Sequence, residues 1–116
     1  MVIGSVQRSV LWWRTRRRPE MAIRYLEALV VALEPEGWRF VRLYRIEEFP
    51  IPVPLLWVYV RHVGIAVSVL AVPGGSWAYY EAHRGRAGYL AVCGDAGTAA
   101  EVVGRQLKRR MFPGTW

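Results

Sequence analysis

The sequence predicts an α+β domain: an N-terminal helix, an antiparallel meander of three to five strands and a C-terminal helix. Helical spacing of apolar residues occurs near both ends of the chain, whereas the middle consists of short apolar and aromatic runs separated by Pro and Gly. The chain has 116 residues and is 53% hydrophobic, which is enough for one core and too little for two. We expect the helices to pack on one face of the sheet.

A helix is expected over residues 19–34, before the strands. Met21, Tyr25, Leu29 and Leu33 recur at helical spacing and form an apolar stripe. The proline that opens this range suits the first helical turn, and the Pro-Glu-Gly run that follows the range ends the helix.

The last helix is expected to run up to Met111. Asp95 or Thr98 caps its beginning, and Thr98 with Glu101 fits the spacing of a capping box. Apolar side chains recur at helical spacing between this cap and Met111, which predicts a stripe that packs on the sheet.

Five runs between the two helices predict strands, because they are nearly all apolar or rich in β-branched and aromatic residues. Pro50, Pro52 and Pro54 cannot lie inside a sheet, so they separate the first run from the second and leave the strand order open. The expected strands span residues 38–47, 55–62, 65–72, 76–83 and 89–93.

The net charge of +7 is distributed unevenly along the chain. Residues 1–18 carry five Arg and no acid, residues 19–104 carry seven Arg against nine acids, and residues 105–116 carry four cations and no acid. Fifteen of the sixteen cations are Arg and Asn is absent, a bias typical of GC-rich coding that does not account for the clustering. We therefore divide the chain into a basic N-terminal arm or short amphipathic helix, 1–18, and a single α+β domain, 19–116.

Within the arm, a short amphipathic helix is expected to begin near Ser5. Ile3, Val6, Val10 and Trp13 have the spacing of one helical face, so these side chains are expected to form its apolar side. The proline after the Arg cluster ends this helix, because it biases the preceding residue away from the helical conformation.

The basic ends of the chain are the strongest functional signal. An Arg cluster beside two Trp residues can bind phosphate through its guanidinium groups and stack bases on the indole faces. A second interpretation is that the cations only complement the dipole of the last helix and the arm stays solvated. A third is that the Trp- and Arg-rich arm binds an anionic membrane surface. The residues expected to bind nucleic acid or another partner are Trp12, Trp13, Arg14, Arg16, Arg17, Arg18, Arg84, Arg86, Lys108, Arg109 and Arg110.

Aromatic residues at alternate positions of two expected strands indicate a second candidate surface. If one sheet face stays open, such residues can stack bases or be buried against a protein partner or a second copy of the chain. The same spacing also fits side chains of a buried core. The candidate aromatic sheet face consists of Trp57, Tyr59, Trp77 and Tyr79.

Catalytic signals are weak. His62, His83, Glu81, Cys93 and Asp95 are the plausible acids, bases and nucleophiles, and Cys93 with His83 is the conceivable nucleophile–base pair. Cys93 lies at an apolar strand end, where an inert buried thiol is usual, and the histidines lack the spacing of metal ligands. We expect no enzyme, metal or cofactor, but a small module that binds nucleic acid or, alternatively, a protein partner or itself.

The composition excludes several other classes of protein. No apolar run approaches the roughly 18 residues that a membrane span needs, which excludes an integral membrane protein. The single cysteine excludes a disulfide scaffold within the chain. We therefore expect a cytoplasmic location.

Several short segments of the chain carry a family resemblance: Ser68–Gly75, Tyr79–Ala82, Arg84–Arg86, Gly88–Leu90, Cys93–Asp95 and Arg110–Pro113. In these segments the chain resembles small hypothetical proteins of high-GC actinobacteria, over residues 21–116. The resemblance implies an actinobacterial origin, which agrees with the coding bias, and a domain limit near Met21. It implies no mechanism.

Overall fold

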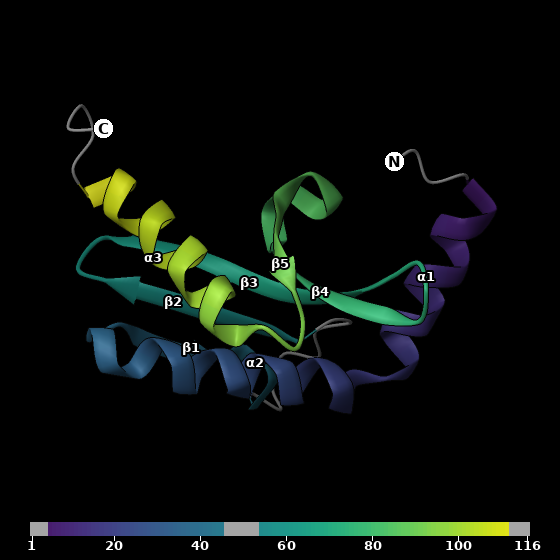
Figure 1. Ribbon diagram of the computed structural model, residues 1–116, viewed down its shortest axis with the longest axis horizontal. Helices are drawn as coiled ribbons and strands as arrows, with labels where there is room; N and C mark the ends of the chain where they lie inside the picture. The colour runs from purple at the N-terminus through teal and green to yellow at the C-terminus, as the bar shows by residue number, and fades with distance from the viewer. Residues whose placement is uncertain (1–4, 46–53, 112–116) are drawn as a thin grey trace.

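The computed structural model describes residues 5–45 and 54–111 and confirms the α+β class (Figure 1). The helices in these ranges are α1 (Ser5–Arg17), α2 (Pro19–Leu33) and α3 (Ala96–Met111). The strands are β1 (Arg39–Arg42), β2 (Leu55–Val60), β3 (Val63–Val72), β4 (Ser76–Glu81) and β5 (Tyr89–Val92). Short 3-10 helices lie at η1 (Glu34–Glu36), η2 (Leu43–Arg45) and η3 (Ala82–Gly88).

The five strands form one antiparallel sheet in the order β1-β2-β3-β4-β5, so the predicted meander is confirmed. The first strand is shorter than expected, because the chain leaves the sheet at Leu43 and turns into η2. Pro50 and Pro52 lie outside the described residues, and the chain re-enters the sheet as β2 directly beside β1. The proline-rich break therefore does not move β1 to the far edge of the sheet.

The helix boundaries follow local capping chemistry. Pro19 occupies the beginning of α2, as the sequence predicts. Asp95 caps α3: its Oδ1 accepts the Thr98 backbone N–H at 3.1 Å and its Oδ2 accepts the Thr98 hydroxyl at 2.8 Å. These hydrogen bonds also lower the pKa of the Asp95 carboxyl, because they favour its charged form.

Helices α2 and α3 pack against each other and cover one face of the sheet (Figure 1). Side chains alternate between the two faces of a strand, so every second residue of β3 turns toward these helices. Burial of this surface is the main driving force for the fold, at about 25 cal/mol per Å² of apolar area. Its largest buried aliphatic and aromatic side chains are Leu26, Leu29, Val30, Leu33, Leu56, Val58, Ile65, Val67, Val69, Tyr79 and Leu107.

Strand β3 is the longest in the sheet and extends past both of its neighbours. Strand β2 pairs with its first half, up to Ser68, and β4 pairs with its second half, from Val67. The two halves of β3 therefore each have one edge without a neighbouring strand in the sheet, on opposite sides. Backbone N–H and C=O groups along such an edge need other partners.

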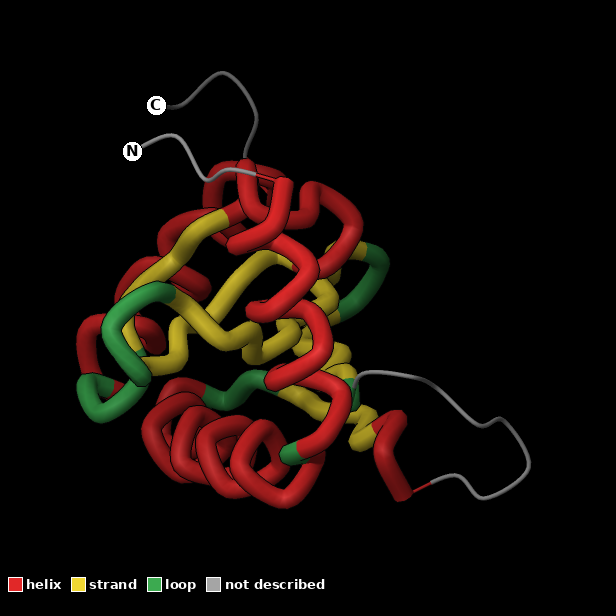
Figure 2. Tube along the Cα trace, turned by 90° about the vertical axis from the view of Figure 1, so that its right-hand side faces the viewer, coloured by secondary structure: helices red, strands yellow, loops and turns green. Residues whose placement is uncertain are grey.

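Helix α1 packs at the end of the sheet where β3 leads into β4; in Figure 2 it crosses the end nearest the viewer, and α2 is seen along its axis. The sequence predicts this helix as an alternative to an arm, but its expected apolar face is wrong. Val10 and Trp13 are exposed, whereas Leu11 and Thr15 are buried against the sheet. Polar groups of α1 bind the edge of β3, so the contact does not use a purely apolar stripe.

The search for a membrane-spanning helix covers only the described residues. None of their helices has the length and apolar character to cross a membrane.

Candidate nucleic-acid interface

Helix α1 is held on the sheet by hydrogen bonds to backbone groups of the β3–β4 hairpin. Thr15 Oγ1 accepts the Ala71 N–H at 2.9 Å and donates its own proton to the Leu11 carbonyl at 2.8 Å. Arg14 Nη2 donates to the carbonyls of Val72, at 3.1 Å, and Ser76, at 2.5 Å. Thr15 thus takes the place that a neighbouring strand would have along this half of β3.

Because Leu11, Arg14 and Thr15 face the sheet, the opposite side of α1 faces solvent. Trp12 and Trp13 are 47% and 59% exposed, and Arg16 and Arg17 are also exposed. The Arg17 guanidinium lies over the Trp13 ring, 4.5 Å from its centroid. Trp12 and Arg16 have the same spacing of four residues, which places them as neighbours on the helix surface. We call these four residues the Trp–Arg face.

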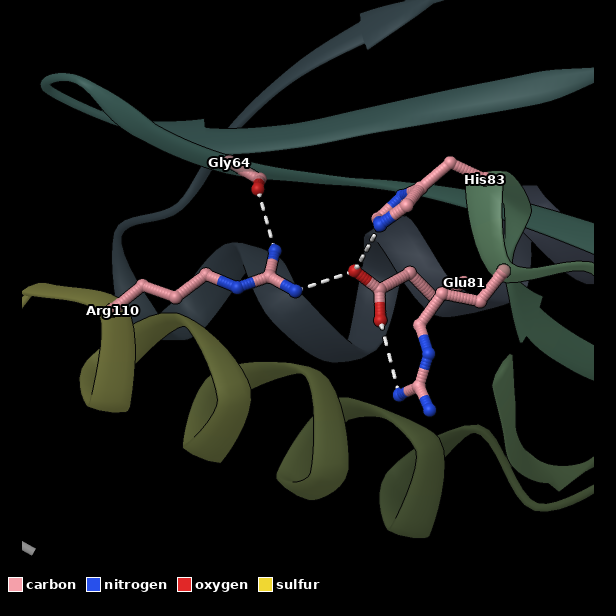
Figure 3. A network of polar contacts seen from close by, with 5 residues as sticks. Gly64, Glu81, His83 and Arg110 are labelled. Atoms are coloured by element: carbon pink, nitrogen blue, oxygen red, sulfur yellow. Dashed lines mark hydrogen bonds and ion pairs between the residues drawn. The ribbon is translucent and has the colours of Figure 1, made fainter. Parts of the chain in front are cut away.

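The other basic end of the chain is tied to one buried carboxylate through Arg110 (Figure 3). Glu81, at the end of β4, is 2% exposed, and its Oε1 lies 2.5 Å from Arg110 Nη2 and 3.4 Å from His83 Nε2. Its Oε2 lies 3.9 Å from Arg84 Nη1. Arg110 Nη1 also donates to the Gly64 carbonyl at 2.9 Å, on the half of β3 that β4 does not reach. Arg110 therefore ties the last turn of α3 to two strands.

Further basic residues and histidines belong to the three segments that Arg110 joins. His83 and Arg84 follow β4, Lys108 and Arg109 precede Arg110 on α3, and Arg61 and His62 form the turn before Gly64. All these residues are exposed, and the Arg110 side chain, at 36%, is less exposed than those of His83 and Arg84. We call the surface formed by Arg61, His62, His83, Arg84, Lys108, Arg109 and Arg110 the α3-end surface.

Lys108 differs from its neighbours because it also lines a recess between α3 and η1. This recess has a volume of about 270 Å³, and Glu36, Glu101, Gly104 and Arg105 line it with Lys108. Two carboxylates thus line the recess beside Lys108 and offset its charge. Arg84 has only the longer 3.9 Å contact with Glu81, and Arg109 is exposed.

The predicted cations divide into two groups. Arg14, Arg86 and Arg110 bind groups of the protein itself: Arg86 Nη2 donates to the Ala71 carbonyl at 3.0 Å, and its guanidinium lies over the Tyr80 ring. Arg18 forms a surface ion pair with Glu20 at 2.8 Å. Arg18 and Arg110 keep exposed side chains despite these contacts, and the other exposed residues of the prediction are Trp12, Trp13, Arg16, Arg17, Arg84, Lys108 and Arg109.

The two groups of exposed cations lie at opposite ends of the molecule. Helix α1 stands at one end of the longest axis, and the last turn of α3 and the β2–β3 turn lie toward the other end (Figure 1). The molecule extends 42 Å along this axis. The two basic ends of the sequence therefore form two surfaces and not one patch.

The four predicted aromatic residues do not share a face of the sheet. Trp57 pairs with Ala66 of β3 and Trp77 pairs with Ala71; these partners are an odd number of residues apart, so they point to opposite faces. Trp77 and Tyr79 are buried beneath the helices. Trp57 and Tyr59 lie on the opposite face.

Trp57 is exposed on that opposite face, as is Tyr89, whose ring packs edge-on against Tyr80 near the other edge of the sheet. The Trp57 indole is 37% exposed and lies flat over Gly64, where an added Cβ would come within 2.3 Å of the ring. Val41, its cross-strand partner on β1, is also exposed. The predicted four-residue face is thus replaced by a small patch of Trp57 and Val41.

The conceivable Cys93–His83 pair is not formed. The Cys93 backbone N–H donates to Trp77 at the beginning of β4, whereas His83 follows the end of the same strand. Burial raises the pKa of the Cys93 thiol to about 12, which keeps it protonated near neutral pH. Within the described ranges, no group of three or more His, Cys, Asp or Glu side chains is arranged to hold a metal ion.

Comparison of the chain with protein-family models, curated proteins and solved structures finds no match. The resemblance to actinobacterial proteins stays a prediction, and the site is interpreted from its own chemistry. Sequence reasoning missed Thr15 as the anchor of α1 and Arg61 as part of the α3-end surface, and it considered His62 and His83 only as acids or bases. Their positions depend on strand lengths and register, for which the linear sequence carries no local signal.

Proposed function

We propose that the protein is a non-enzymatic module that binds single-stranded nucleic acid through the Trp–Arg face of α1. The observation that carries this proposal is the pairing of two exposed indoles with two exposed guanidinium groups on one helical surface. Guanidinium groups bind phosphate, and indoles stack on unpaired bases, which a duplex keeps inside its own stack.

The charge around this face supports the same ligand. The first eighteen residues contain no Asp or Glu, so no carboxylate of this segment opposes an incoming phosphate backbone. Thr15 and Leu11 fix α1 on the sheet, so the four side chains are presented from an ordered helix. A preorganised surface loses less conformational entropy on binding than a disordered arm would.

The proposal is tested by titrating a fluorescent single-stranded oligonucleotide with the full chain and measuring anisotropy. Trp12→Ala with Trp13→Ala is expected to weaken binding by at least about tenfold, since stacking contributes about 1–3 kcal/mol per base. Arg16→Gln with Arg17→Gln is expected to weaken binding and to flatten its salt dependence, because phosphate contacts release counterions. All these side chains are exposed, so circular dichroism is expected to show an unchanged fold.

The matched control removes two cations elsewhere. Arg24→Gln with Arg39→Gln changes the net charge equally at exposed positions on α2 and β1, and is expected to leave binding nearly unchanged. Equal losses in the control and in the α1 variants would contradict a specific site. Binding of vesicles with anionic lipids but not of oligonucleotides would replace nucleic acid by a membrane surface as the ligand.

A second candidate function is self-association or binding of a protein partner through the Trp57–Val41 patch. The exposed indole beside an exposed Val on the sheet face opposite α2 and α3 favours this alternative. Trp57→Ser is expected to abolish a dimer seen by light scattering, if this patch forms one. A wild-type chain that stays monomeric would remove self-association from consideration.

A further inference from the structure

The α3-end surface gathers cations that the sequence keeps far apart. Arg61, Arg84 and Arg109 come from the β2–β3 turn, the segment after β4 and the last turn of α3. The Arg110 guanidinium joins these three segments through Gly64 and Glu81 (Figure 3). The surface contains five Lys and Arg side chains against the buried Glu81 carboxylate and the two carboxylates, Glu36 and Glu101, in the recess beside Lys108, so it keeps a net positive charge.

Glu81 holds Arg110 in place but offsets little of the positive charge of the other cations on this surface. The carboxylate is buried and contacts Arg110 most closely, whereas Arg84 reaches it only at 3.9 Å and is 54% exposed. Arg109 points away from the buried side of α3 and is exposed. The outer cations therefore remain accessible to a polyanion, and phosphate is the ligand group that such clustered guanidinium groups favour.

The two surfaces differ in what they can bind. The Trp–Arg face offers indoles for bases as well as guanidinium groups for phosphates, whereas the α3-end surface offers clustered cations. The helix that carries each surface is hydrogen-bonded to a different half of β3: α1 through Thr15 and α3 through Arg110. The two surfaces therefore lie apart along the 42 Å axis. A short nucleic-acid segment bound at one end leaves the other end available.

We propose that the α3-end surface is a second, phosphate-binding site, and that one protein molecule bridges two nucleic-acid segments. This inference rests on the proposed function of the Trp–Arg face, because bridging requires both ends to bind nucleic acid. The Trp–Arg face holds one segment by stacking and phosphate contacts, and the α3-end surface holds the backbone of another.

The test mixes two short single-stranded oligonucleotides, one with a donor dye and one with an acceptor dye, and titrates the full chain into the mixture. Energy transfer is expected to rise as the protein bridges the strands and to fall again when protein is in excess. Arg84→Gln with Arg109→Gln is expected to reduce the maximal transfer by roughly tenfold, because phosphate contacts are lost at one end only. The same variant is expected to keep the affinity of the Trp–Arg face within about twofold, since distant sites act independently.

The control variant Arg24→Gln with Arg39→Gln removes the same charge and is expected to retain the transfer of the wild-type protein. Thermal unfolding of each variant verifies that the fold is kept. Oligonucleotide binding by the wild-type protein without energy transfer would overturn the second site while leaving the proposed function intact. Transfer that persists in the Arg84→Gln, Arg109→Gln variant would also overturn it, because bridging would then come from self-association, which light scattering of the mixture detects.

Failure of the wild-type protein to bind any oligonucleotide would overturn both the proposed function and the bridging. The failure of the proposed function and the failure of bridging are distinguishable. Anisotropy measures binding at the Trp–Arg face, whereas energy transfer requires binding at both the Trp–Arg face and the α3-end surface.

Discussion

Both basic ends of the chain bind to β3, but at opposite halves of the strand and with different chemistry. At the α1 end, a neutral hydroxyl of Thr15 accepts a backbone N–H, and Arg14 donates to backbone carbonyls. At the α3 end, Arg110 donates to the Gly64 carbonyl and also neutralises the buried Glu81 carboxylate. One or two cations per end are thus structural, and the others remain exposed.

The neutral hydrogen bond of Thr15 and the ion pair of Arg110 are expected to contribute different amounts to the free energy of unfolding. Loss of a neutral hydrogen bond leaves one buried polar group without a partner, whereas loss of Arg110 leaves a buried charge with weaker, more exposed partners. We expect the α3 end to be the more sensitive of the two.

The largest effect is expected for Arg110→Ala. Removing one partner of a buried ion pair typically lowers the free energy of unfolding by about 3–5 kcal/mol. Because Arg110 is partly exposed, we expect the low end of this range, about 3 kcal/mol. Arg109→Ala, at the neighbouring exposed position, is expected to change the free energy of unfolding by less than about 0.5 kcal/mol. Urea denaturation followed by circular dichroism measures both; equal effects would mean that Glu81 does not depend on Arg110.

A smaller effect is expected at the α1 end, for Thr15→Val. The valine keeps the shape but removes the acceptor of the buried Ala71 N–H, which costs about 1–3 kcal/mol. Thr15→Ser keeps the hydroxyl and is the matched control, expected to lie closer to the wild-type protein in the same denaturation experiment. If the serine variant loses as much stability as the valine variant, the hydroxyl is not the anchor.

The smallest effect concerns alkaline pH and the core between the two ends. The pKa of Cys93 is raised from 9.0 to about 12 by burial, and burial raises the pKa of Tyr79 as well. Above the pKa of the unfolded thiol the unfolded chain releases a proton that the folded chain retains, so stability falls as pH rises from about 9 toward 12. Below this window the thiol makes no pH-dependent contribution.

Cys93→Ala is expected to make this alkaline loss of stability shallower, with the remaining slope due in part to Tyr79. Denaturant midpoints measured at several pH values from neutral to alkaline provide the comparison. An unchanged slope in the alanine variant would show that the thiol titrates alike in the folded and unfolded chains.

The sequence predicted much of the fold because its signals are local. Pro19 and the apolar stripe that ends at Leu33 define α2, Asp95 caps α3, and the Pro and Gly turns separate the strands. Each of these features depends on neighbours within a few residues, so the linear sequence is sufficient. The strand β1 was predicted, but its early end at Arg42 was not, because the residues after Arg42 have the composition of a strand although the chain turns into η2.

The candidate site was predicted only in part. The exposed indoles and guanidinium groups of α1 follow from sequence clustering, but the burial of Leu11 and Thr15 in place of Val10 and Trp13 does not. The division of Trp57 and Trp77 between two faces required the register of two strand pairs. A shift of one residue in that register would have placed them together.

The sequence by itself determined the α+β class, the order of the elements and the concentration of Arg at both ends of the chain. The tertiary structure decided which of these Arg residues are structural and which face solvent, and it separated the two ends along the long axis. The physical reason is the stagger of the sheet: β3 extends past β2 on one side and past β4 on the other. Its two unpaired edges require polar partners, which the two basic ends supply together with Arg86.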